Sequence, residues 1–152
     1  MPRTSWPPIR LGALSVRFVL DGETSSGAAT AFECEVPAHA VMGAAHSHDG
    51  FEETNYGLAG VTTFTVDGEL RELHPGEVVF IARGVVHAFE NRSDEDAKFL
   101  AVVTPGRLGP DYFKEIGALL SAAEGPPDLA AIGEVMRRHG LTPAMDSAGA
   151  AS

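Results

Sequence analysis

Short apolar stretches alternate with polar residues over most of the chain. Gly, Pro, Asp or Asn interrupts them about every ten positions, a spacing typical of a β-sandwich or β-barrel. Asp67-Gly68 stands between two such stretches and is a turn dipeptide that predicts a hairpin. The sequence therefore predicts an all-β fold. Its expected strands cover 11–20, 28–36, 52–58, 61–66, 69–73, 77–81, 86–90 and 98–104.

The pattern changes after residue 106, where apolar residues begin to follow helical spacing. One helix is expected over 111–123, and a Gly-Pro-Pro segment ends it. Asp128 can cap a second helix over 129–139, which Gly140 would end. Both helices are expected to pack on the outside of the barrel, because each needs a surface on which to bury its apolar face.

The chain has 152 residues, which suffices for one domain with its own core. Asp and Glu outnumber Lys and Arg by 21 to 11, and this acidic balance disfavours a nucleic-acid partner. No apolar run reaches the ~18 residues of a membrane span, and the first residues lack the apolar core of a signal peptide, so a cytoplasmic protein is expected. The expected organisation is a barrel domain over 1–106, a helical extension over 107–142 and a disordered tail over 143–152.

Two histidines separated by one residue, His46 and His48, are the strongest candidates for chemistry. Side chains alternate along a strand, so both imidazoles can point to one interior position. An acidic pair follows at Glu52 and Glu53, and His87 lies further along the chain. Histidine with carboxylate suits iron, manganese, nickel, cobalt, copper or zinc better than calcium or magnesium. The sequence predicts a site for one divalent transition metal ion without choosing among these six.

Either Glu52 or Glu53 could reach such a metal. In an uninterrupted strand, Glu53 would face away from the histidines, because it lies an odd number of residues from both. Asp49-Gly50 can break the pleat, and in the restarted strand Glu53 and Asn55 would share the inner face. Tyr56 would then point outward, and packing is its expected role.

These residues resemble the two short motifs of the cupins. The resemblance covers residues 40–104 and implies a jelly-roll barrel with motifs at 43–60 and 76–91. It also implies that the metal ligands are His46, His48, Glu53 and His87. The structural turns would be Gly60, Gly76 and Gly84. The chain departs from the second motif at Ala82, where proline is usual and would stiffen the turn.

The chain looks like single-domain cupins of the quercetinase-like type, and this resemblance implies a metal-dependent dioxygenase. A chelating enol or hydroxyl substrate would bind the metal, and Glu53 would act both as ligand and as acceptor of the substrate proton. Two alternatives stay open: a non-redox metal-dependent cyclase, isomerase or decarboxylase, and a barrel that binds a small molecule without turnover.

Two further expectations concern the surface of the barrel. Exposed sheet edges and the family resemblance suggest a homodimer. Arg83 could meet an anionic substrate at the barrel mouth, although a solvated turn residue is the simpler interpretation. Cys34 lies in an alternating strand pattern and is expected to be a small buried hydrophobe.

Overall fold

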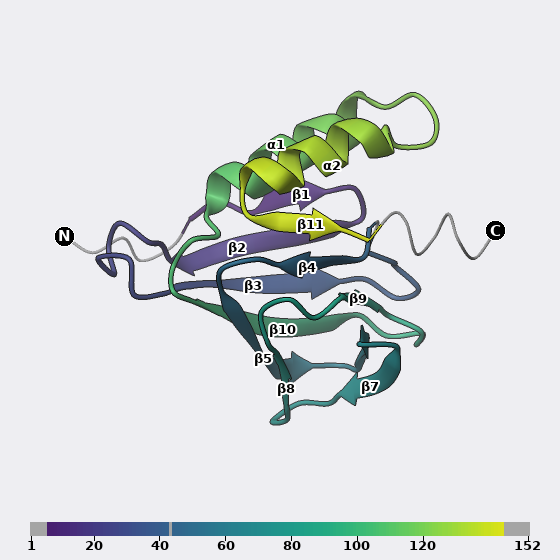
Figure 1. Cartoon of the computed structure of the whole chain (residues 1–152). Coiled ribbons are helices and arrows are strands. Elements are labelled where there is room, and N and C mark those ends of the chain that lie inside the picture. The colour runs from purple at the N-terminus through teal and green to yellow at the C-terminus, as the bar shows by residue number, and fades with distance from the viewer. Residues whose placement is uncertain (1–5, 43, 145–152) are drawn as a thin grey trace.

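The computed structural model describes residues 6–42 and 44–144, which form two antiparallel sheets with an apolar core between them (Figure 1). This jelly-roll arrangement confirms the predicted all-β fold. One sheet orders its strands as β1 (Ile9–Leu11), β2 (Leu14–Leu20), β3 (Thr30–Val36), β10 (Ala97–Thr104), β5 (Glu52–Ala59) and β8 (Val78–Ile81). The other sheet orders them as β11 (Leu141–Pro143), β4 (His46–His48), β9 (His87–Glu90), β6 (Thr62–Val66) and β7 (Glu69–Leu73).

The first expected strand, over 11–20, is in fact part of a hairpin. Gly12 has a φ of 64°, in the left-handed region that favours glycine, and the chain reverses there so that Leu11 pairs with Leu14. The prediction of one continuous strand was wrong because the apolar pattern runs through the turn. The hairpin predicted at Asp67-Gly68 is confirmed, since β6 and β7 pair on either side of it.

The two predicted helices are present as α1 (Pro110–Ala122) and α2 (Leu129–Arg138). The Asp128 side chain caps α2 by accepting a hydrogen bond from the Ala131 backbone N–H at 3.1 Å. Gly140 follows the helix with a φ of 85°. Figure 1 shows both helices above the barrel, where α1 packs on β1 and α2 packs on β11. The helical extension therefore packs against an edge strand of each sheet, β1 in one and β11 in the other.

After α2 the chain returns to the barrel as β11, a strand that the sequence pattern did not predict. It pairs with β4 over three residues, and the Ala144 N–H then donates to the Ala45 carbonyl at 2.9 Å. Residues 143 and 144, from the expected tail, thus belong to this pairing. The rest of that expectation lies outside the described residues.

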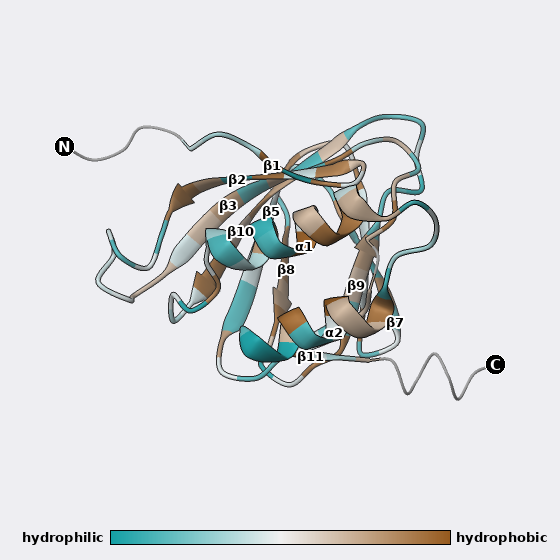
Figure 2. Ribbon diagram, turned by 90° about the horizontal axis from the view of Figure 1, so that it is seen from above, coloured by the Kyte–Doolittle hydropathy of each residue, from teal (hydrophilic) through white to brown (hydrophobic). Residues whose placement is uncertain are grey.

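Aromatic side chains tie the helices to the core between the sheets. The rings of Phe18 and Phe32, from the six-stranded sheet, lie 5.7 and 4.9 Å from the ring of Phe113 on α1. Cys34 is buried, as expected. Figure 2 looks down on the helices and shows them lying across the strands, with hydrophobic residues on both. Among the described residues, no helix is long and apolar enough to cross a membrane.

Candidate metal centre

The candidate ligands come from two sheets. His46 and His48 form the two ends of β4, and His87 begins β9 and is the direct cross-strand partner of His46. The bend at Asp49-Gly50 then carries the chain from the five-stranded to the six-stranded sheet, where Glu53 lies on β5. The sequence predicted a break in the strand alternation at this bend, and in the structure the break is the point where the chain passes from one sheet to the other.

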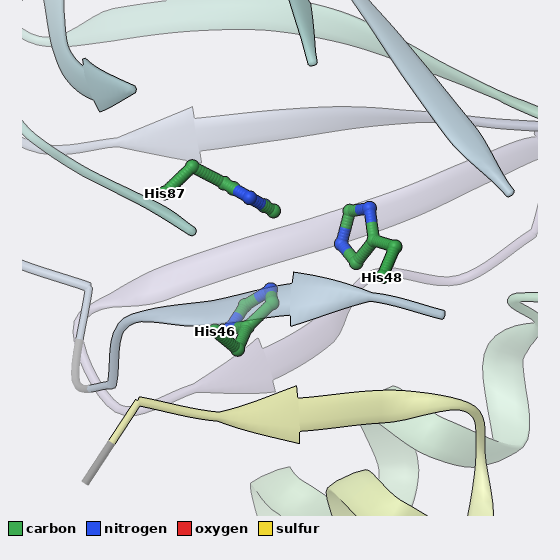
Figure 3. Close-up of side chains that lie close together, drawn as sticks. All are labelled: His46, His48 and His87. Atoms are coloured by element: carbon green, nitrogen blue, oxygen red, sulfur yellow. The ribbon is translucent and has the colours of Figure 1, made fainter. Parts of the chain in front are cut away.

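The three imidazoles are buried and turned toward one another (Figure 3). One ring nitrogen from each of His46, His48 and His87 lies within 4.8 Å of the others, and these form the group of potential metal donors found among the described residues. Phe51 stacks on the His48 ring with centroids 4.5 Å apart, so it limits the orientations open to that ring. The three ring nitrogens are therefore already placed so that they could bind one metal ion together.

Hydrogen bonds from the backbone fix two of these rings. Nδ1 of His46 lies 3.0 Å from the Ala44 carbonyl, and Nδ1 of His87 lies 3.0 Å from the Val85 carbonyl. A carbonyl can only accept, so each Nδ1 carries the proton and each Nε2 keeps a free lone pair. Such outer hydrogen bonds are the usual way in which proteins orient metal-binding histidines.

The environment also keeps the histidines in the form that binds metal. Burial, helped by the nearby His87, lowers the pKa of His46 to about 3. Burial and the neighbouring His87 and His46 lower the pKa of His48 to about 2. These rings are neutral at physiological pH, as metal ligation requires. In addition, Nδ1 of His48 is buried without a hydrogen-bond partner. The residues present fit a late first-row metal ion, whose identity they do not decide.

Glu53 borders the histidine cluster from the opposite sheet. Its Oε1 lies 3.8 Å from Nε2 of His48, although the carboxylate is outside the mutual 4.8 Å group of the three histidines. The side chain is buried, and burial raises the pKa of its carboxyl group, while nearby His87 and a hydrogen bond from Asn55 act in the other direction. A carboxylate held in this way is a stronger base than one in water.

The rest of β5 follows the predicted alternation. Glu53 and Asn55 face the interior, whereas Glu52 is only half-buried and Tyr56 is 43% exposed on the outer face. Tyr56 thus points outward, as the alternation predicted. Glu52 forms an ion pair with Arg83, whose side chain does not line the cavity described next. Of the two interpretations of Arg83, the solvated turn residue is the one that fits.

A cavity of about 310 Å³ adjoins the histidines and extends under the helices. His46, His48, Glu53 and His87 form its polar end. The rest is almost entirely carbon, supplied by the sheets and by residues from both helices. The helical contributions are Tyr112, Phe113, Ile116, Leu120, Leu129, Ile132 and Met136.

Sequence reasoning did not assign a role to two residues near Glu53. Asn55 is fully buried, and its side-chain amide donates to the Val79 carbonyl at 3.4 Å and helps to lower the pKa of Glu53. The sequence signal for Asn55 was its position two residues after Glu53 on the same strand. Tyr112 on α1 is 5% exposed and lines the cavity. Burial, with the nearby Glu53 charge, raises the pKa of its hydroxyl group. No local motif marks Tyr112, because only the packing of α1 brings it to the site.

Comparison with known proteins places this geometry in context. Residues 32–103 match the family described as Cupin_2, the cupin domain. A quercetin 2,3-dioxygenase of Bacillus subtilis is 32% identical over 72 residues, which are 47% of this chain and 21% of that enzyme. The chain thus matches about a fifth of that relative's length.

Solved structures extend the likeness. A structure from Thermotoga maritima, described as a predicted oxalate decarboxylase, has a TM-score of 0.60 and 27% identity over 67% of this chain and 92% of its own. The polyketide cyclase RemF of Streptomyces resistomycificus has a TM-score of 0.53 and 25% identity, over 68% of this chain and 78% of its own. KdgF from a Halomonas species, with 18% identity, 66% and 86% coverage and a TM-score of 0.58, shares the fold.

Proposed function

Because the chain belongs to the cupin superfamily, we propose that it is a metal-dependent enzyme acting on a small organic molecule, and more specifically a dioxygenase of the quercetinase-like type. The observation that carries the proposal is the convergence of three buried, oriented imidazoles on one wall of an apolar cavity. The Bacillus subtilis relative, which is described as a dioxygenase, supports the more specific assignment.

His46, His48 and His87 would hold the metal ion, and Glu53 would complete the set of ligands. A bound ion of this kind supplies Lewis acidity or, for a redox-active metal, electron transfer with dioxygen. The backbone hydrogen bonds to Nδ1 of His46 and His87 would orient both rings for binding the ion through Nε2.

Glu53 has a second role in this proposal, as the acceptor of the proton from a substrate hydroxyl group. Its buried carboxylate, with a raised pKa, takes up that proton more readily than an exposed one. Asn55, two residues further along the same strand and fully buried, is the neighbouring amide that would help to orient the carboxylate. The apolar walls exclude water from the deprotonated substrate, which strengthens its electrostatic interactions with the site.

A non-redox reaction is the second candidate. RemF, at 25% identity, is described as a polyketide cyclase, and three histidine nitrogens suit zinc as well as iron. In that case the same residues would polarise a carbonyl group and move a proton through Glu53, with no need for dioxygen.

Elemental analysis of the purified chain, without an affinity tag that carries nickel, tests the site itself. We expect near-stoichiometric metal in the natural chain and loss of it in His87→Ala. His74→Ala, at a half-exposed loop histidine, is the matched control and should retain the metal. Equal metal content in both variants would contradict the assignment of the histidine cluster.

Oxygen uptake with chelating enols and flavonols then tests the reaction type. Uptake of one dioxygen per substrate, greatly reduced in Glu53→Gln that still holds metal, is the result expected for the dioxygenase. Turnover that persists without oxygen would favour the non-redox candidate. Binding of these compounds without turnover would leave a non-catalytic barrel and contradict the enzyme proposal.

A further inference from the structure

Helices α1 and α2 lie outside the residues that match the cupin family, yet they build much of the cavity. The strands contribute the histidines, Glu53 and part of the apolar lining. The helices contribute a second, mostly apolar part, the helical roof, which consists of Tyr112, Phe113, Ile116, Leu120, Leu129, Ile132 and Met136. The body of a bound molecule would therefore contact residues that belong to the C-terminal extension. This division makes the extension the natural place for substrate selection.

The charges around the cavity are unusual for a site that takes a small organic acid. No lysine or arginine belongs to the described residues that line it. Its titratable groups are the three histidines, Glu53, Cys34 and Tyr112. A carboxylate placed away from the metal would lose its hydration without gaining a cation and would lie in the field of Glu53, which is costly.

We propose that the helical roof selects a largely apolar, uncharged substrate body and excludes molecules that carry a carboxylate beneath the helices. The proposal rests on the proposed function for its metal-bound end, but the recognition of the body depends on the helices alone. With a cavity at the lower end of the usual range of roughly 300–1,000 Å³, the fitting molecule has a compact ring system.

Tyr112 gives this roof its polar contact. Of the described residues that line the cavity, Tyr112 carries the hydroxyl group, and no serine or threonine joins it. A phenol is protonated at neutral pH and can donate a hydrogen bond. A hydroxyl or carbonyl oxygen on the substrate would accept that bond, so the roof distinguishes an oxygenated ring from a plain hydrocarbon.

Displacement of the uncharged fluorescent probe N-phenyl-1-naphthylamine from the full chain tests the proposal. We expect 2-naphthol to displace the probe at concentrations roughly ten-fold or more below those of 2-naphthoate, which has the same rings and a charge. Leu129→Lys places a cation at a 49% exposed position that lines the cavity, and should reduce this preference about two- to five-fold. Leu70→Lys, at a 58% exposed position away from the cavity, is the matched control and should change nothing.

The same assay tests Tyr112 with the conservative variant Tyr112→Phe. The preference for 2-naphthol over 2-methylnaphthalene should fall about five-fold, the value of one hydrogen bond, while 2-methylnaphthalene itself binds as before. Equal displacement by 2-naphthol and 2-naphthoate, or an identical preference in Leu129→Lys and Leu70→Lys, would overturn the proposed selection. All of these readouts are taken on chelator-treated protein and none of them requires turnover, so failure of the proposed function would leave the results unaffected.

Discussion

The buried histidines predict that the metal-free protein loses stability steeply in mild acid. In the unfolded chain a histidine takes up a proton near pH 6.5, whereas folded His46 and His48 resist protonation down to about pH 3 and 2. Below pH 6.5 the unfolded state therefore binds more protons than the folded state, and stability falls as the pH falls. Stability continues to fall with pH until the pH reaches the pKa values of the two histidines in the folded state.

The magnitude follows from the linkage between proton binding and folding. Each histidine costs about 1.4 kcal/mol per pH unit below pH 6.5. Unfolded histidines are already half protonated at pH 6.5, so between pH 6.5 and pH 5 the loss is about 1.7 kcal/mol for each ring and about 3.3 kcal/mol for the pair. Glu53 acts in the opposite sense, because its raised pKa makes folding more favourable as the pH falls through that value, and it offsets part of the loss.

Urea unfolding of the chelator-treated protein at a series of pH values measures this directly. His48→Gln removes one of the two rings, so its stability between pH 6.5 and pH 5 should fall about 1.7 kcal/mol less than that of the natural chain. A free energy of unfolding that stays constant over this interval in both proteins would refute the reasoning. It would mean that the rings are protonated or solvated in the folded state.

Two further predictions concern packing and assembly. Leu141 is a buried residue of β11 that pairs with His48. In Leu141→Ala, urea unfolding should show a free energy of unfolding lower by about 2–5 kcal/mol, and metal titration should show weaker metal binding. Metal affinity equal to that of the natural chain would contradict the second expectation. The expected homodimer would cover the exposed Val78 and Phe80 on the edge strand β8, so light scattering should report a dimer for the natural chain and a monomer for Phe80→Glu. If the natural chain is monomeric at every concentration, the prediction of a homodimer is wrong.

The barrel could be predicted because its signals are local. Alternation of apolar and polar residues marks most strands, and Asp67-Gly68 marks a hairpin through its backbone chemistry. The same reasoning explains the spacing of His46 and His48. It failed at Gly12, where one apolar stretch contains two strands, since a glycine inside such a stretch does not by itself indicate a reversal.

Features that depend on distant parts of the chain were beyond this reasoning. The three residues of β11 are too short to carry a periodic signal, and only their return after α2 places them beside β4. Tyr112 reads as one more apolar residue of a helix until α1 packs on the barrel. In both cases the missing information is the docking of the helical extension, which tertiary contacts decide.

That docking gives the extension a second consequence for the site. β4 shares one residue pair with β9, His46 with His87, but three with β11, and the Asp49 N–H that follows β4 donates to the Gly140 carbonyl at 2.8 Å. The strand with two of the candidate ligands is therefore held largely by residues that follow α2. Because Leu141 pairs with His48 and also lines the cavity, a shift of the helices around a bound molecule would be transmitted to the ligand strand. We therefore expect occupancy of the helical roof to be coupled to the geometry of the histidines through β11, so that metal affinity responds to ligands that never touch the metal.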